Sequence, residues 1–460
     1  MNRLSRVQTL AGTCVLGASL LVQSRALAHG REASVGQITF DRSDPDHFVM
    51  RTTWALLTTR DNGRSFTWTC ATAAGFDRLI EDPPLVIAES GPLVVGTFDG
   101  IRRSDPSGCG YFDGQASTRG SFAIDVQEDS TGAIWVAMSP GDAVNTFLRS
   151  TDGGLTFTTM GSAPADLLLE RMRIAPSDPM RIYASGAIPG IRSVPRRTVF
   201  IYSEDGGVTF ASTEIPLLSA EERNAHVVAV DPTNASRVLV RMVRRVTDMV
   251  PERLLLSEDG GRTFRTVLEL VEMTGVVFSH DGQHVWVGSW DGGFMRSDDG
   301  GLTFITLDAE LRVRCLAERA AEDGTSDLLV CVDAFTQPYA VARSFDLGQN
   351  LERVWGFSDA VNDVGCNACT DVGATCPAYW PDVVFDLALT RDDAGPPPGP
   401  IDAGPRLICD EAGMPIDAGA TPPTPPPSGC GCHVEGSPSR SAWLPLALGL
   451  LLTMRRRRSA

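Results

Sequence analysis

The chain has 460 residues, of which 43% are hydrophobic and 21% charged, with 45 glycines and 30 prolines. This composition excludes both a disordered acidic chain and a small disulfide-stabilised domain, and the length allows one large repeat domain or two to three ordinary ones. The 57 acidic residues outnumber the 40 basic ones, all of which are arginine, so the net charge is -17. A general nucleic-acid binder is therefore excluded, because neutralising phosphates requires a positive surface.

Residues 1–28 have the pattern of a secretory signal peptide. Arg3 and Arg6 precede an apolar stretch over 7–22, and Ala26, Leu27 and Ala28 form an A-x-A cleavage site. A short buried helix is the alternative interpretation of this stretch. We expect cleavage after Ala28 and export of the remaining chain.

A short motif recurs through the body of the chain. Its clear copies read Ser, any residue, Asp, Gly, Gly, any residue, Thr, Phe, and the copies start 40 to 54 residues apart. That spacing is typical of one four-stranded propeller blade per copy. The second copy is degraded, because Pro106 stands where the aspartate belongs. The seven copies begin at Thr59, Ser104, Ser150, Ser203, Ser257, Ser297 and Ser344.

The motif resembles the Asp-box, or BNR, repeat of β-propellers related to sialidases and to the photosystem II assembly factor. We predict an all-β fold, a seven-bladed β-propeller of four-stranded antiparallel blades over 29–358. The glycines of the motif accept positive φ in a tight hairpin, the Asp, Ser and Thr side chains bind turn amides, and the Phe enters the core between blades. We therefore assign a structural role, neither catalytic nor metal-binding, to Asp61, Asp152, Asp205, Asp259, Asp299 and Asp346.

The chain beyond the propeller divides into three segments. A cysteine-containing extension over 359–389 comes first, followed by a linker over 390–429 with three Asp-Ala-Gly triplets and several proline runs. Such a composition cannot bury a core and favours extended polyproline conformations, so we predict a disordered, semi-rigid stalk. The final segment, 430–460, is predicted to contain a short apolar helix.

The final segment combines three features in a fixed order. Cys430 and Cys432 precede an apolar stretch over 442–454, and arginines occupy 455–458. This order resembles a myxobacterial-type C-terminal sorting signal, which implies processing of the tail and retention at the cell surface. A plain helical membrane anchor is the alternative, although about 13 apolar residues fall short of the ~20 that a spanning helix needs. Both interpretations place the body of the protein at the cell surface or outer membrane, or outside the cell after processing.

Eight cysteines lie between the two ends, and an even number in an exported protein favours disulfides. A bridge from Cys70 to Cys109 would replace the aspartate that the second copy of the motif lacks. Cys315 and Cys331 lie on the predicted first two strands of blade seven, which are adjacent. The remaining four could bind zinc in principle, but export and the absence of a nearby histidine favour two disulfides. These four are Cys366, Cys369, Cys376 and Cys409.

Catalytic and metal-binding residues are not evident from the sequence. Sialidases, which the repeat resembles, require an arginine triad, a Tyr nucleophile paired with Glu and an Asp acid, and their early Arg-Ile-Pro signature is absent. Only Tyr183 and Tyr202 fall in the middle blades, and both have the neighbours of strand residues. His280 and His284 flank a turn rather than a helical face, so we predict no metal site and no cofactor.

Two predicted loops are rich in arginine. In blades four and five the extra length falls between the second and third strands, over 187–197 and 242–253, on the face opposite the motif turns. Arginine forks bind planar anions in a bidentate manner, which favours a carboxylate- or sulfate-bearing partner. Pairing with nearby acids such as Asp248 and Glu252 is the alternative. The candidate binding residues are Arg192, Arg196, Arg197, Arg244, Arg245 and Arg253.

The sequence as a whole predicts an exported, surface-tethered propeller that binds a protein or an anionic glycan without catalysis. Contact with a membrane is expected through the C-terminal segment only. An exo-glycosidase of the sialidase class is the alternative function.

Overall fold

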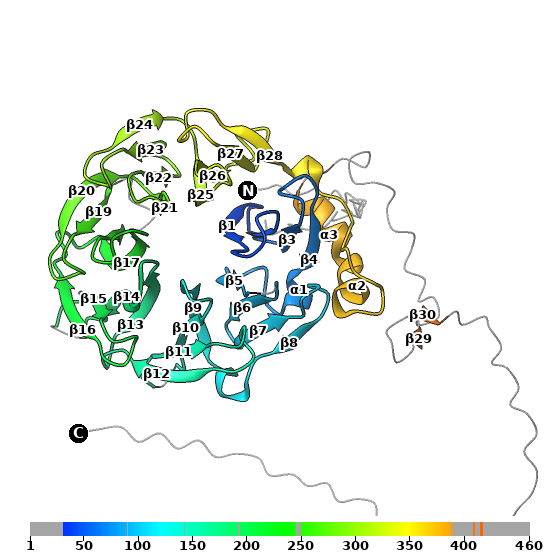
Figure 1. Cartoon of the computed structure of the whole chain (residues 1–460), viewed down its shortest axis with the longest axis horizontal. Helices are drawn as coiled ribbons and strands as arrows, with labels where there is room; N and C mark the ends of the chain where they lie inside the picture. The colour runs from blue at the N-terminus through cyan, green and yellow to red at the C-terminus, as the bar shows by residue number, and fades with distance from the viewer. Residues whose placement is uncertain are drawn as a thin grey trace, which may run out of the picture. The chain divides into compact units, whose positions relative to one another are not determined.

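Seven four-stranded antiparallel sheets form a ring around a central opening in the computed structural model of the protein (Figure 1). The structure describes residues 31–389 except 90, 142, 192–193, 245–249 and 388, together with the backbone of 408–409 and 415–416. The predicted seven-bladed propeller is confirmed. The predicted signal peptide, most of the stalk and the C-terminal segment, including Ala28, Cys430 and Cys432, lie outside the described residues.

Each blade is formed by four consecutive strands, and its first strand lies nearest the centre of the ring (Figure 1). Blade one comprises β1 (Val35–Phe40), β2 (Phe48–Thr52), β3 (Ala55–Thr59) and β4 (Thr67–Cys70). Blade two comprises β5 (Leu85–Ile87), β6 (Leu93–Thr97), β7 (Gly100–Ser104) and β8 (Tyr111–Asp113). Blade three comprises β9 (Phe122–Glu128), β10 (Ile134–Ser139), β11 (Thr146–Ser150) and β12 (Thr158–Ser162). Blade four comprises β13 (Leu168–Ala175), β14 (Asp178–Ile188), β15 (Arg197–Ser203) and β16 (Ala211–Ile215).

The remaining three blades follow the same order. Blade five comprises β17 (Glu222–Val230), β18 (Val238–Arg244), β19 (Glu252–Ser257) and β20 (Arg265–Leu270). Blade six comprises β21 (Met273–Phe278), β22 (Val285–Ser289), β23 (Phe294–Ser297) and β24 (Ile305–Asp308). Blade seven comprises β25 (Val313–Ala320), β26 (Ser326–Val332), β27 (Val341–Ser344) and β28 (Glu352–Trp355).

The order of the strands defines two faces of the ring. Every sheet is an antiparallel meander, so its connections alternate between the two ends of the strands. The hairpins that join the first to the second strand and the third to the fourth lie on one face, here called the turn face. The loops between second and third strands, and the connections between blades, lie on the opposite face, here called the loop face.

The recurrent motif closes the second hairpin of each blade. In blade three, Asp152 Oδ1 accepts a hydrogen bond from the N–H of Thr156 (2.9 Å) and from the hydroxyl of Ser150 (2.7 Å). The Ser150 hydroxyl in turn accepts the N–H of Gly154 (2.9 Å), whose φ is +85°. Phe157 is buried between blades two and three. The predicted bonds to the turn amides are present, and equivalent bonds are made by Asp61, Asp205, Asp259, Asp299 and Asp346.

The degraded copy in blade two replaces its missing aspartate from within the turn. Asp105 lies one position earlier than the aspartate of the other copies, and its Oδ1 accepts bonds from the Ser107 hydroxyl (2.6 Å) and the Cys109 N–H (3.2 Å). The expectation that a Cys70–Cys109 bridge takes over this role is therefore wrong. The adjacent carboxylate performs it.

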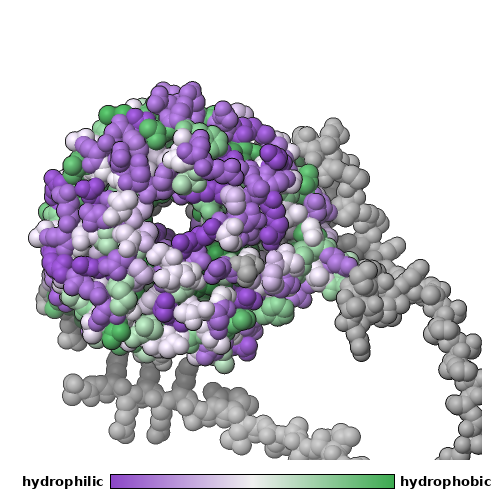
Figure 2. Space-filling view, in the orientation of Figure 1, coloured by the Kyte–Doolittle hydropathy of each residue, from purple (hydrophilic) through white to green (hydrophobic). Residues whose placement is uncertain are grey.

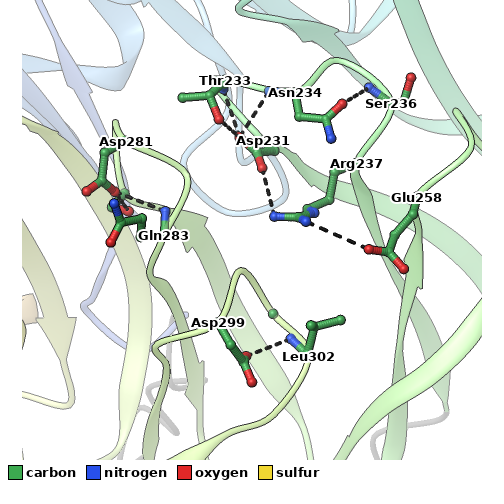
Figure 3. A network of polar contacts seen from close by, with 12 residues as sticks. Asp231, Thr233, Asn234, Ser236, Arg237, Glu258, Asp281, Gln283, Asp299 and Leu302 are labelled. Atoms are coloured by element: carbon green, nitrogen blue, oxygen red, sulfur yellow. Dashed lines mark hydrogen bonds and ion pairs between the residues drawn. The ribbon is translucent and has the colours of Figure 1, made fainter.

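Aspartates also close the first hairpin of several blades. Asp231 Oδ1 accepts the N–H groups of Thr233 (2.8 Å) and Asn234 (3.2 Å) in blade five (Figure 3). Arg237 then links Asp231 (3.3 Å) to Glu258 of the motif turn (3.7 Å), so the two hairpins of the blade brace each other. Asp41 and Asp129 close the corresponding turns of blades one and three.

The ring closes between blade seven and blade one without a shared strand. Arg319 on β25 donates to the Pro45 carbonyl (2.7 Å) and to Asn62 Oδ1 (3.0 Å) of blade one, and Arg343 on β27 donates to the same Asn62 oxygen (2.7 Å). Buried Asp327 pairs with both arginines, at 3.0 and 2.9 Å. One carboxylate therefore fixes the two guanidinium groups that hold the first and last blades together.

The extension after blade seven returns to the outside of blades one and two, where α2 and α3 lie beside β4 and α1 (Figure 1). Disulfides join Cys376 to Cys70 and Cys366 to Cys109, and the Val372 N–H donates to the Cys109 carbonyl (3.1 Å). The helices here and between blades are α1 (Ala71–Ala74), η1 (Ala116–Thr118), η2 (Phe357–Asp359), α2 (Asp371–Thr375), η3 (Cys376–Tyr379) and α3 (Trp380–Asp386). A two-residue pair, β29 (Ile408–Cys409) and β30 (Pro415–Ile416), completes the described elements.

The disulfides confirm one predicted pairing and correct the others. Cys315 and Cys331 face each other in register on β25 and β26 and are bonded, as predicted. Cys70 and Cys109 are not bonded to each other, and Cys366 and Cys376 are not bonded within their own group, because the extension folds back onto the ring. Cys369 is also disulfide-bonded, while the side chain of Cys409 lies outside the described residues.

We predict that acid weakens the motif turns in a narrow pH window. Hydrogen bonds from the Thr209 side chain and N–H and from Ser203 lower the pKa of Asp205 to about 2 from 3.8. Stability from such a carboxylate is complete above pH 3.8 and is lost as the pH falls to about 2. The stability difference between wild type and Asp205→Asn should therefore shrink as the pH falls from 4 to about 2. Thermal unfolding of both proteins at each pH measures this stability difference. A difference that stays constant with pH would contradict the role given to the Asp205 carboxylate.

We also predict that the two bridges to the extension stabilise the fold more than the bridge within blade seven. Cys70–Cys376 and Cys109–Cys366 close loops of 306 and 257 residues, against 16 for Cys315–Cys331. Replacing the four cysteines of the two extension disulfides with serine should lower the free energy of unfolding. This loss should exceed the loss caused by Cys315→Ser with Cys331→Ser by roughly 2 kcal/mol or more. Urea denaturation without reductant provides the comparison. Equal losses would show that the extension does not constrain the ring.

Candidate functional site

The two arginine-rich loops lie on the loop face, as their strand positions require. They join β14 to β15 and β18 to β19. Arg192 and Arg245 lie outside the described residues. Arg196, Arg197, Arg244 and Arg253 are described, and their surroundings differ.

Arg244 and Arg253 are held by a buried carboxylate. Arg253 is 7% exposed and donates to both oxygens of Glu222, at 2.7 and 3.0 Å, and to the Pro216 carbonyl (3.1 Å). Arg244 lies 3.8 Å from the same carboxylate. Burial acts to raise the pKa of Glu222, but hydrogen bonds from Arg253 and the Leu218 N–H outweigh it and leave the pKa lowered. These two arginines fix the start of blade five.

Arg196 and Arg197 are more available. Arg197 makes an exposed ion pair with Glu214 at 3.5 Å, which solvent screens and which contributes little stability. Arg196 donates to the Arg223 carbonyl (2.8 Å) and to Asn224 Oδ1 (2.5 Å), and among the described residues it has no carboxylate partner. Its neighbours orient the guanidinium without neutralising its charge.

Arg171, which the sequence analysis did not single out, carries a free charge on the innermost strand of blade four. It is exposed and makes no hydrogen bond or ion pair with any described residue. The neighbouring Arg173, by contrast, pairs with Asp125 of blade three at 3.0 Å and donates to the Val228 carbonyl of blade five. The signal available in the sequence was an arginine pair spaced two residues apart on a first strand, which puts both side chains on one face.

The charge of Arg171 acts on basic groups of two other blades. Burial lowers the pKa of Arg51 in blade one, against the opposing effect of Asp82, and repulsion from Arg171 adds to the lowering. Burial likewise lowers the pKa of His226 in blade five, with Glu170 opposing and Arg171 contributing. Hydrophilic residues border the central opening in the space-filling view (Figure 2). Arg171 therefore lies close enough to Arg51 and His226 for its charge to act on both.

The described residues do not assemble the constellation of a sialidase. The Tyr183 hydroxyl donates to the Ala235 carbonyl at 2.6 Å, and Tyr202 lies beneath Arg262. Of the other tyrosines, Tyr111 is buried and Tyr379 lies in the extension. All five are described, and none has a hydrogen bond to a glutamate.

The two candidate histidines lie on a turn, as predicted, and each is beside its own acid. His280 Nδ1 lies 2.8 Å from Glu318, and His284 Nδ1 lies 2.9 Å from Asp298. Among the described residues, no group of three or more His, Cys, Asp or Glu side chains is arranged to hold a metal ion. No helix in the same part of the chain is long and apolar enough to span a bilayer.

Comparison with known proteins finds similar solved structures, whereas no family model and no curated protein matches the chain. YCF48 from Cyanidioschyzon merolae is 15% identical, with coverage of 65% of this chain and 93% of that one and a TM-score of 0.46. A structure of YCF48 bound to D1 peptide is 12% identical, with coverage of 65% and 89% and a TM-score of 0.43. The GH74 enzyme of Niastella koreensis is 11% identical, with coverage of 70% and 78% and a TM-score of 0.26. These likenesses concern the fold alone.

We predict that Glu222 is structural and that Arg171 is not. Glu222→Gln should lower the free energy of unfolding by about 3–5 kcal/mol, because it leaves Arg253 buried beside an uncharged partner. Arg171→Ser should leave the melting temperature unchanged, because the side chain is exposed and unpaired. Denaturant titration of both variants measures the difference, and a strongly destabilised Arg171→Ser would contradict this division.

Proposed function

We propose that this protein is an exported, surface-tethered binding module that takes an anionic group of a protein or glycan at Arg171 on the innermost strand of blade four and at Arg196 in the loop between β14 and β15, without catalysis. The observation that carries the proposal is Arg171, a charged and exposed side chain without a partner among the described residues. Arg196, which only neutral oxygens orient, is the second member of the site.

The charge of the chain gives these two arginines their importance. A net charge of -17 repels anions at long range, so an anionic partner is held only where local positive charge is left over. Guanidinium forks bind carboxylates and sulfates through two parallel hydrogen bonds, and this geometry selects planar or tetrahedral oxyanions. Arg171 and Arg196 meet that requirement, whereas Arg244 and Arg253 are already committed to Glu222.

The remaining parts of the proposal concern the repeat and the location of the protein. The motif turns are Asp-box (BNR) repeats, which is supported by the hydrogen bonds shared by Asp61, Asp152, Asp205, Asp259, Asp299 and Asp346. Export is supported by the A-x-A site at Ala28 and by three disulfides among the described residues. Retention at the surface through Cys430, Cys432 and the C-terminal segment rests on the sequence.

We predict that replacing the two available arginines abolishes binding of anionic ligands without loss of stability. Arg171→Ser with Arg196→Ser should weaken binding to sulfated or carboxylated glycans, or to acidic peptides, by roughly tenfold or more, because charge-assisted hydrogen bonds are lost. Glycan and peptide arrays identify the ligand, and titration calorimetry measures the change.

Arg265→Ser is the matched control, because Arg265 is an exposed arginine on the outer strand β20 that pairs with Glu258. It should leave binding unchanged. Equal binding by the wild type and the double variant would refute this site. Turnover of a fluorogenic glycoside by the purified protein would instead favour the exo-glycosidase alternative.

A further inference from the structure

A cavity of about 450 Å³ lies between blade one and the extension, far along the chain from the loop-face arginines. One wall comes from Trp54, from Trp68 on β4 and from the segment after β4. The other wall comes from Tyr379, Asp382 and Val383 of the extension. This volume is within the range of small-molecule sites, which are commonly lined by apolar and aromatic groups with a few polar ones.

The two walls are fixed to each other. The Cys70–Cys376 disulfide lies between them, and Cys70 itself lines the cavity. The backbone N–H of Trp68 donates to the Asp363 carbonyl at 3.0 Å, and the centre of the Trp68 ring lies 5.6 Å from that of the Trp380 ring. A ligand therefore meets a preformed site and does not have to order it, which lowers the cost of binding.

The lining of the cavity is largely aromatic. Trp54 and Trp68 are 4% and 2% exposed, and neither indole nitrogen has a partner among the described residues. Phe76 adds a third ring, and Tyr379, which is 36% exposed, lies at the edge. Tyr379 is therefore the most accessible of the aromatic rings that line the cavity.

Charged groups gather at one side of the cavity. Arg78 forms an ion pair with Asp386 and lies 3.7 Å from Asp382, while Asp77 is exposed beside it. Two carboxylates thus lie beside one guanidinium group. The carboxylates disfavour an anionic ligand, and their pairing with Arg78 reduces their attraction for a cationic one.

We infer that this cavity binds a neutral saccharide. A sugar ring offers apolar C–H faces that pack on aromatic rings, and its hydroxyls both donate to carboxylates and accept from Arg78. An entirely apolar ligand would remove water from Asp77, Arg78 and Asp382 and would offer these side chains no hydrogen bond in its place. The inference does not depend on the proposed anion-binding site, since the two sites share no residue.

Isothermal titration of the full-length protein with neutral oligosaccharides tests the inference. The probes are the hexamers of maltose-, cellulose-, xylan-, mannan- and chitin-type chains. At least one should bind, and Tyr379→Ala should raise its Kd roughly tenfold through loss of ring packing. Asp382→Asn should raise the Kd by a similar factor, because the amide accepts sugar hydroxyls less strongly than the carboxylate.

Phe385→Ala is the matched control, because Phe385 is an aromatic residue of α3, the helix that carries Asp382, and it is 63% exposed and does not line the cavity. Its Kd should equal that of the wild type, as should the Kd of Arg171→Ser. All variants should unfold at the wild-type temperature, which separates lost binding from lost fold. The inference is overturned if none of the hexamers binds, if Tyr379→Ala and Asp382→Asn bind as the wild type does, or if only apolar peptides compete for the cavity.

Discussion

Closure of the ring between blade seven and blade one is the constraint on which the rest of this structure depends. No strand is shared by the two ends, so the junction consists of side chains and covalent bridges. Asp327 aligns Arg319 and Arg343, both of which bind the same oxygen of Asn62 in the motif turn of blade one. A carboxylate buried with two guanidinium groups is costly to form and more costly to break, because removing one partner leaves a charge without compensation.

The extension reinforces this junction from outside. Its two disulfides bond Cys70, at the end of blade one, and Cys109, in blade two. The extension therefore crosses the junction between blades seven and one and is attached on its far side. The same folding back creates the cavity, whose walls would otherwise separate. A single structural requirement, holding the last part of the chain against the first blades, therefore also produces a preformed site.

The use of arginine as the only long cation shapes the surface. Its planar fork can bridge a carboxylate and a carbonyl of different blades, as Arg253 and Arg173 do here. Arg319 is used in the same way, between Asp327 and the Pro45 carbonyl. An arginine that is left without an acid, such as Arg171, is therefore more informative in this protein than its charge alone would suggest.

The sequence by itself determined the number of blades, the form of their turns and the Cys315–Cys331 bridge, because all three depend on residues close together in the chain. The motif encodes a hairpin through bonds that span only a few positions, and the bridge joins two strands of one meander. Only the tertiary structure decided the partners of Cys70 and Cys109, the burial of Arg253 against Glu222 and the isolation of Arg171. These depend on which segments meet when the ring closes and the extension folds back, and such long-range packing leaves no periodic signal in the chain.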